Sequence, residues 1–204
     1  MKSKQQGPLR VEPLRVSIYA DSSMLWHSSA SQYSHLLGVE RTEIRPDYHK
    51  VKSRVQHQSL KALVRMGLSP SIEQAKDSTQ FDLHLCISSS RSSSTGSGRG
   101  FLDRMEEIGW QTHVVYRAKG SQRFDWAPSI CCMVAEEVIK APPSLVTVCS
   151  GSGALLPLEA LCQKQGVPFM MVGYLDSLCA QYTHTAHLDD KTLMTLNGRG
   201  WGSL

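Results

Sequence analysis

The sequence predicts an α/β protein with an open, mostly parallel β-sheet and helices on both faces, a Rossmann-like three-layer sandwich. Two apolar runs support this prediction, residues 144–149 and residues 167–173. Short runs of this kind, rich in β-branched residues, are typical of strands buried on both faces. Between them lie a Gly/Ser turn, Ser150–Gly153, and a helical pattern over residues 154–165. The segment is therefore interpreted as a β-α-β unit with a right-handed crossover.

Composition favours one globular domain. The chain has 204 residues, of which 41% are hydrophobic and 20% charged, and its formal net charge is +4. We expect one domain over residues 14–193, with a flexible tail at residues 1–13 and a Gly-rich tail at residues 194–204. The six cysteines fall in expected strands and helices rather than in loops, which favours reduced thiols in the cytoplasm.

No membrane partner is expected. No apolar run approaches the roughly 20 residues that span a bilayer. Residues 1–8 are basic and polar, and no apolar segment of the kind found in secretory signals follows them.

The other elements are assigned in chain order. Residues 14–20 alternate between apolar and polar well enough for a first strand, which Asp21 ends. Within residues 22–80 the sequence predicts only an amphipathic helix over 49–66, with Gly67 as its C-cap. A low-complexity Ser/Gly segment, residues 88–100, is interpreted as a flexible loop. The remaining expected elements are strands at 81–88, 111–116 and 185–188 and helices at 101–108, 127–140 and 175–181.

Polar side chains are expected at the carboxyl ends of the strands, where open α/β sheets hold their ligands. Asp21 follows the first strand, Asp125 precedes the helix over 127–140, and Ser150 and Ser152 follow the strand over 144–149. A second interpretation stays open for each acid, because Asp21 suits an ordinary turn and Asp125 suits a helix N-cap.

Basic residues gather in an expected helical insertion around residues 45–66. Two interpretations stay open: a solvated helix face, or a surface that contacts nucleic-acid phosphates. Arg91 and Arg99 would let the Ser/Gly loop reach an anion. The candidate nucleic-acid-binding residues of the insertion are Arg45, Lys50, Lys52, Arg54 and Lys61.

The order of these elements resembles the NYN domain, a branch of the PIN-like ribonuclease superfamily. Residues 16–21 match that family's first strand and its terminal Asp, and Lys119–Asp125 matches a K-G…D helix start. Ser150–Leu158, with the sequence SGSGALLPL, matches the signature S-G-D-x-D-F-x-P-L in register. The resemblance adds Lys119 and Ser150 to the candidate nucleic-acid-binding residues.

The resemblance implies a site in which several Asp residues hold Mg²⁺ or Mn²⁺ for RNA hydrolysis. Asp21 and Asp125 keep two such positions and are the candidate metal ligands, and Ser152 completes the residual catalytic set. Ser152 and Ala154 stand where the family signature has its two Asp residues. The family site is therefore degenerate in this chain.

Three functions are consistent with these observations. The first is binding of RNA, or of another single-stranded nucleic acid, without cleavage. The second is weak metal-dependent endoribonuclease activity that uses Asp21 and Asp125. The third is a structural or assembly role, with a protein partner or a homodimer, in which only the scaffold is retained.

Overall fold

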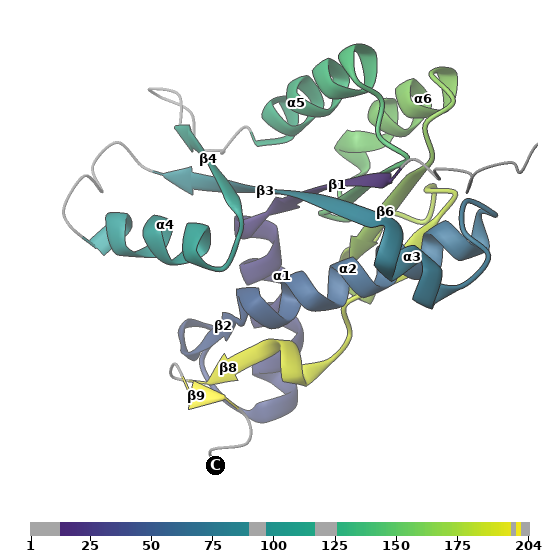
Figure 1. Cartoon of the computed structure of the whole chain (residues 1–204). Helices are drawn as coiled ribbons and strands as arrows, with labels where there is room; N and C mark the ends of the chain where they lie inside the picture. Colours follow the sequence, from purple (N-terminus) through teal and green to yellow (C-terminus); the bar gives the residue numbers. More distant parts are fainter. Residues whose placement is uncertain (1–12, 90–96, 117–125, 197–198, 201–204) are drawn as a thin grey trace, which may run out of the picture.

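The fold is a three-layer α/β sandwich. The computed structural model describes residues 13–89, 97–116, 126–196 and 199–200. Its central sheet has six parallel strands in the order β4-β3-β1-β5-β6-β7, with helices on both faces (Figure 1), which confirms the predicted fold class. The strands are β1 (Leu14–Asp21), β3 (Thr79–Ser89), β4 (Gln111–Tyr116), β5 (Leu145–Cys149), β6 (Phe169–Gly173) and β7 (Thr185–His187).

The helices form two layers. Figure 1 shows α5 and α6 on one face of the sheet and α1, α2 and α4 on the other. Each layer closes its own apolar core against the sheet. The helices are α1 (Ser22–Leu37), α2 (Tyr48–Arg65), α3 (Ile72–Ser78), α4 (Ser97–Glu107), α5 (Trp126–Lys140) and α6 (Leu156–Lys164).

The central strand β1 serves both layers, because successive side chains of a strand point to opposite faces. Val16, Ile18 and Ala20 are fully buried in the core under α1 and α2. Tyr19 points the other way and belongs to the core under α5 and α6. β1 pairs with β3 on one side and with β5 on the other, so its position sets the position of both halves of the sheet.

Residues 22–37, for which no element was predicted from the sequence, form a long helix, α1. Asp21 caps α1, because its Oδ1 accepts hydrogen bonds from the backbone N–H groups of Ser23 (2.9 Å) and Met24 (3.2 Å). Gly38, with φ 65°, ends the helix in the left-handed conformation. The helix expected over 49–66 is α2, so that prediction is confirmed.

The expected basic insertion is an integral layer of the domain rather than an addition to it. Val51, Val55 and Leu63 of α2 are fully buried in the core beneath the sheet. Residues 44–46 precede this helix as a short strand, β2 (Ile44–Pro46), after the 3₁₀ turn η1 (Arg41–Glu43).

Several expected boundaries differ from the structure. β3 continues to Ser89 and α4 already begins at Ser97, so the expected loop over 88–100 is shorter at both ends. Pro157 at the start of α6 leaves residues 153–155 as a 3₁₀ turn, η2 (Gly153–Leu155), instead of helix. The helix expected over 175–181 is only the 3₁₀ turn η3 (Leu175–Ser177).

The expected C-terminal tail begins with a strand. β8 (Met194–Leu196) follows the 3₁₀ turn η4 (Lys191–Leu193) and pairs antiparallel with β2, and β9 (Arg199–Gly200) pairs with β8. These strands form a second, three-stranded sheet, which lies below α2 in Figure 1 and in front of the lower part of α1. Met194 is fully buried, so this segment is part of the folded unit.

Two chemical expectations can be compared with the structure. All six cysteines are free thiols, as expected for a chain without disulfides. Among the described residues, no helix combines the length and apolar character that crossing a bilayer requires.

Met194→Ala should lower the free energy of unfolding by about 2–4 kcal/mol, the range for truncating a large buried side chain. The matched control is Thr195→Ala in the same strand, where an exposed hydrogen bond to the Arg45 carbonyl oxygen is lost at a cost below about 1 kcal/mol. Urea denaturation of both variants measures the difference. Equal, small effects would show that β8 is not part of the cooperative unit.

Candidate functional site at the carboxyl edge of the sheet

The strand order creates a switch point between β1 and β5. From β1 the chain builds outward to β3 and β4, and then returns across β1 to start β5. Open α/β sheets place their ligands in the crevice at the carboxyl side of such a point. Ala20 pairs with Cys149, so the next residues, Asp21 and Ser150, lie at the same edge of adjacent strands. This agrees with the placement expected for these two residues.

Asp21 is fully buried at this edge. Its Oδ1 caps α1, whereas its Oδ2 is buried and has no hydrogen-bond partner in the part of the chain that the structure describes. Burial raises the pKa of Asp21 from 3.8 to about 6, and the hydrogen bonds from the N–H groups of Met24 and Ser23 oppose that rise only in part. The cap accounts for one carboxylate oxygen and leaves the other uncompensated.

The turn from Ser150 to Gly153 is packed against the segment that follows β6. Gly151 has φ +85°, and a Cβ added there would lie 2.6 Å from the Ser177 carbonyl oxygen. The Cys179 N–H donates to the Gly151 carbonyl oxygen (2.9 Å), and the Tyr182 hydroxyl donates to the carbonyl oxygen of Ser152. Only glycine fits this close approach of two backbones.

The hydroxyl groups of this turn serve the turn itself. Ser152 Oγ accepts from the Ala154 N–H (3.3 Å) and so caps η2. Ser150 is fully buried, and its Oγ lies 3.5 Å from the Ser152 nitrogen. The expected free N–H groups at this helix start are therefore partly satisfied within the turn, and Ser150 is not exposed to a ligand.

The described residues at this edge do not form a Mg²⁺ or Mn²⁺ site. Hard divalent ions require several oxygen ligands at short range. Asp21 is enclosed and already engaged on one oxygen, and no three His, Cys, Asp or Glu side chains of the described segments are arranged to hold a metal ion. Asp125, the second expected ligand, lies outside the described residues.

A cavity of about 660 Å³ opens beside this edge, between α1 and the segment after β6. We call it the edge cavity. Ser177, which contacts the Gly151 position, is part of its wall, so the cavity adjoins the Ser150–Gly153 turn. Its lining residues are His27, Ser28, Ser31, Gln32, His35, Leu36, Arg41, Tyr174, Asp176 and Ser177.

The polar groups of the edge cavity come mainly from one side of α1. His27, Ser31 and His35 are four residues apart, which places them on one helix face. The Arg41 guanidinium donates to the Ser31 hydroxyl (3.2 Å). No helix was predicted over residues 22–37, so this cavity was not expected from the sequence, although the eight-residue spacing of His27 and His35 fits one face of a helix.

A second cavity, of about 350 Å³, lies between the start of α2 and α4. We call it the α4 cavity. Tyr48 lies in its wall. Burial, and then the charge of the nearby Asp21 carboxylate, raise the pKa of this phenol. The lining residues are Arg45, Pro46, Asp47, Tyr48, His49, Phe101, Arg104, Met105, Ile108 and Thr195.

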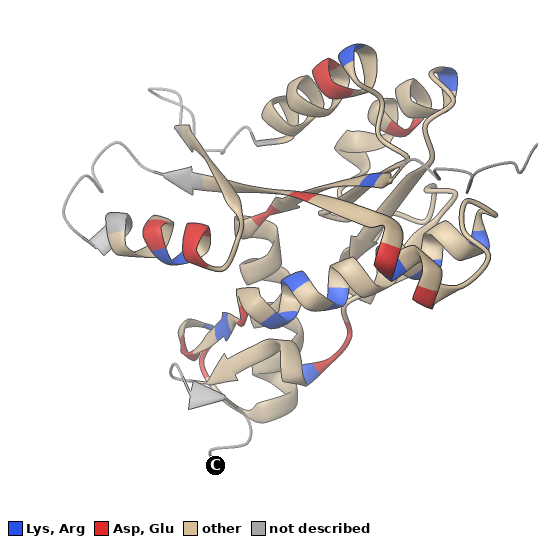
Figure 2. Cartoon of the chain, viewed as in Figure 1, with Lys and Arg blue, Asp and Glu red and all other residues tan. Residues whose placement is uncertain are grey.

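One lysine and one arginine side chain of α2 are bound by neighbouring elements. Figure 2 shows Lys and Arg spaced along this helix, with acidic residues on the segment beside it. Lys52 Nζ donates to the Ile108 carbonyl oxygen (2.6 Å). Arg54 forms an ion pair with Asp190 at 2.5 Å. These two candidate nucleic-acid-binding residues are therefore engaged inside the molecule.

The other three candidates of this cluster are more accessible. Lys50 and Lys61 are exposed on α2, and Lys50 lies 3.6 Å from Asp47. The Arg45 guanidinium lies over the indole of Trp26, 5.5 Å from the ring centre.

The structure describes only part of the expected set. Arg91, Lys119 and Asp125 lie outside the described residues. Arg99 belongs to α4 instead of the expected loop, and its side chain is outside the described part.

Gly151→Ala should lower the free energy of unfolding by about 2–4 kcal/mol, because a positive φ and a backbone clash act together. Gly166→Ala is the matched control: its φ is +70°, but nothing lies within 4 Å of an added Cβ. The control should cost only about 1 kcal/mol. Thermal or urea denaturation gives both values, and equal costs would contradict the close approach to Ser177.

Asp21→Asn should stabilise the protein at high pH. The raised pKa means that the folded state binds the Asp21 proton more tightly, so its stability falls as the pH rises from about 4 through 6. Asn retains the cap without the charge. The expected gain is about 3 kcal/mol at pH 8 and about half of that at pH 5. Urea denaturation at both values measures it, and a loss of stability at pH 8 would mean that a cation compensates the carboxylate.

Comparison with known proteins identifies the fold alone. No family model matches the chain, and no curated protein matches it. A crystal structure of a protein of unknown function from Vibrio parahaemolyticus is similar, with a TM-score of 0.60 and 15% sequence identity. The similarity covers 93% of this chain and 98% of the other. The two proteins share the architecture over nearly their whole lengths.

Proposed function

We propose that this protein binds single-stranded RNA at the carboxyl edge of its sheet without cleaving it. The RNA would extend from the edge cavity across residues 41–49 to the α4 cavity. This segment supplies Arg41 to the first cavity and Arg45 and His49 to the second. The resemblance of the Ser150–Leu158 signature to NYN domains is a second, independent reason to propose RNA.

The chemistry of the edge cavity is the observation that carries the proposal. Single strands are bound by cationic grooves with rings on which bases can stack. Arg41 and His35 are exposed there, in the same wall as one exposed carboxylate, Asp176. The exposed His27 ring lies against Trp26 at 4.5 Å between ring centres. The Gln32 amide already donates to Asp189 (3.1 Å) and has a second N–H for a phosphate or sugar oxygen. The Ser28 hydroxyl, which donates to Met24 Sδ (3.1 Å), can accept from a sugar hydroxyl.

The absence of cleavage is proposed from the charge at the switch point. Metal-dependent phosphodiester hydrolysis needs clustered carboxylates that hold divalent ions against the phosphate. Of the expected ligands that the structure describes, Asp21 is enclosed and Ser152 serves as a cap. Neither residue therefore presents a free oxygen atom that could coordinate a metal ion in the cavity.

Fluorescence anisotropy with labelled single-stranded RNA tests the binding. If Arg41, Arg45 and Arg104 each contact one phosphate, raising the salt from 50 to 200 mM should weaken binding roughly 10- to 20-fold. Arg41→Gln should weaken binding about three- to tenfold and make the salt dependence shallower. Lys164→Gln is the charge-matched control, because it lies exposed on α6 on the opposite face of the sheet and should leave affinity unchanged.

Incubation of the same RNA with Mn²⁺ tests the second half of the proposal. The RNA should remain intact. Cleavage that is lost in Asp21→Asn would replace the proposal with a weak metal-dependent ribonuclease. Equal RNA affinity in Arg41→Gln, Lys164→Gln and the parent protein would rule out the proposed RNA-binding surface. A stable complex with a protein partner, without RNA binding, would then favour an assembly role.

A further inference from the structure

One half of the sheet face under α5 is polar. Buried parallel sheets are usually apolar on both faces. The part of this face formed by β5 and β6 follows that rule, with Val148 and Met171 fully buried. The part formed by β1, β3 and β4 instead carries Arg15, Ser17, Tyr19, Asp82, His84, Gln111 and His113.

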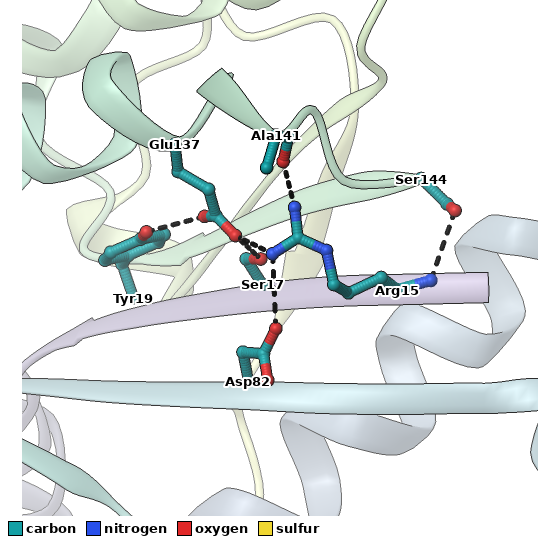
Figure 3. Close-up of polar contacts among 7 residues, drawn as sticks. All are labelled: Arg15, Ser17, Tyr19, Asp82, Glu137, Ala141 and Ser144. Atoms are coloured by element: carbon teal, nitrogen blue, oxygen red, sulfur yellow. Dashed lines mark hydrogen bonds and ion pairs between the residues drawn. The ribbon is translucent and has the colours of Figure 1, made fainter. Parts of the chain in front are cut away.

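The polar side chains of this half-face that lie nearest α5 form a hydrogen-bond network with that helix. Glu137 of α5 accepts from Arg15, from Ser17 Oγ (2.6 Å) and from the Tyr19 hydroxyl (2.7 Å), as Figure 3 shows. Asp82 lies 3.3 Å from the same guanidinium. The network is satisfied internally and carries one positive and two negative charges.

Two histidines lie beside this network and pair with each other. His84 Nδ1 and His113 Nε2 lie 3.0 Å apart on adjacent strands. The Tyr19 ring stacks on His84, with ring centres 4.6 Å apart and planes 13° from parallel, which holds the imidazole in place.

A cavity of about 390 Å³ adjoins this pair. Its charged residues outside the network are Glu136 and Lys140, which pair with each other at 2.5 Å. The Lys, Arg, Asp and Glu side chains of the described wall therefore carry two positive charges, Arg15 and Lys140, and three negative ones, Asp82, Glu136 and Glu137. The excess of one negative charge favours a cation over an anion.

We propose that His84 and His113 together bind one divalent transition-metal ion, with Cu²⁺ preferred. Imidazole nitrogens bind such ions at about 2.0–2.1 Å. Two nitrogens 3.0 Å apart then subtend an angle of roughly 94° at the metal, whereas the tetrahedral angle needs a separation of about 3.3–3.4 Å. An angle near 90° fits the tetragonal geometry of Cu²⁺ or Ni²⁺, and Cu²⁺ binds most tightly among the first-row divalent ions.

Metal binding replaces the hydrogen bond between the two rings. The proton that the two facing nitrogens share moves to the other nitrogen of its own ring, so two neutral imidazoles release no proton. No third His, Cys, Asp or Glu among the described residues completes a three-ligand group. Water from the adjoining cavity supplies the remaining positions, and exchangeable ligands can therefore reach the ion.

Cu²⁺ titration of the full-length protein, followed by electron paramagnetic resonance, tests this site. The parent protein should bind one Cu²⁺ with two equatorial imidazole nitrogens. His84→Asn and His113→Asn should each weaken that binding at least tenfold and remove one nitrogen from the spectrum. His57→Asn is the matched control, because His57 is exposed on α2 and its loss should change neither affinity nor spectrum.

A second measurement uses only the parent protein and so does not depend on the folding of a variant. Substoichiometric Cu²⁺ should broaden the imidazole NMR signals of His84 and His113 before those of any other histidine. Equal affinity in the parent protein and both variants, or simultaneous broadening of all histidine signals, would overturn the proposal. RNA binding is not used in either readout, so this result is separate from that of the proposed function.

Discussion

The fold depends on one carboxylate, that of Glu137, which accepts hydrogen bonds from three side chains of the central strand. Glu137 has only 14% of its side chain exposed and accepts from Arg15, Ser17 and Tyr19, which occupy alternate positions of β1. A partly buried guanidinium and a buried phenol are costly unless their hydrogens are accepted. The contacts therefore fix α5 over β1 at one register. Because β1 pairs with strands on both sides, the helix layer and both halves of the sheet are positioned together.

The same strand ends at the switch point, and there no described residue compensates its charge. Arg15 at one end of β1 faces two carboxylates, whereas Asp21 at the other end has one oxygen to which none of the described residues donates a hydrogen bond. The pKa of Asp21, about 6, records that difference in surroundings. Its capping bonds give α1 a defined start, and α1 in turn supplies one wall of the edge cavity. The site beside the switch point thus follows from the way β1 ends.

Local sequence signals were sufficient for the sheet but not for the contacts between distant segments. Apolar runs, glycines and prolines mark β1, β3, β4, β5 and β6, and the topology then places Asp21 beside Ser150. By contrast, α1 is rich in serine and has a weak apolar stripe, so its formation depends on Asp21 and on tertiary contacts such as the Trp26 N–H bond to the Ile44 carbonyl oxygen. β2 and β8 are three residues each and lie about 150 positions apart, beyond any local pattern. The pairing of Arg54 with Asp190 is equally distant, which is why the basic helix looked freer in the sequence than it is.

If the protein binds RNA as proposed, the position of Asp21 also constrains where the RNA backbone would lie. A buried carboxylate without a cation repels phosphate, and the low polarity around it weakens that repulsion less than water would. The first exposed cations that follow Asp21 in the sequence, Arg41 and Arg45, come after the end of α1 instead of at the strand end. In the proposed RNA complex, a phosphate chain would therefore be favoured beside these two guanidinium groups and disfavoured over the strand end itself. In that arrangement the phosphates would contact arginine and not Asp21, so the complex would hold RNA without bringing its phosphodiester to a metal at the switch point.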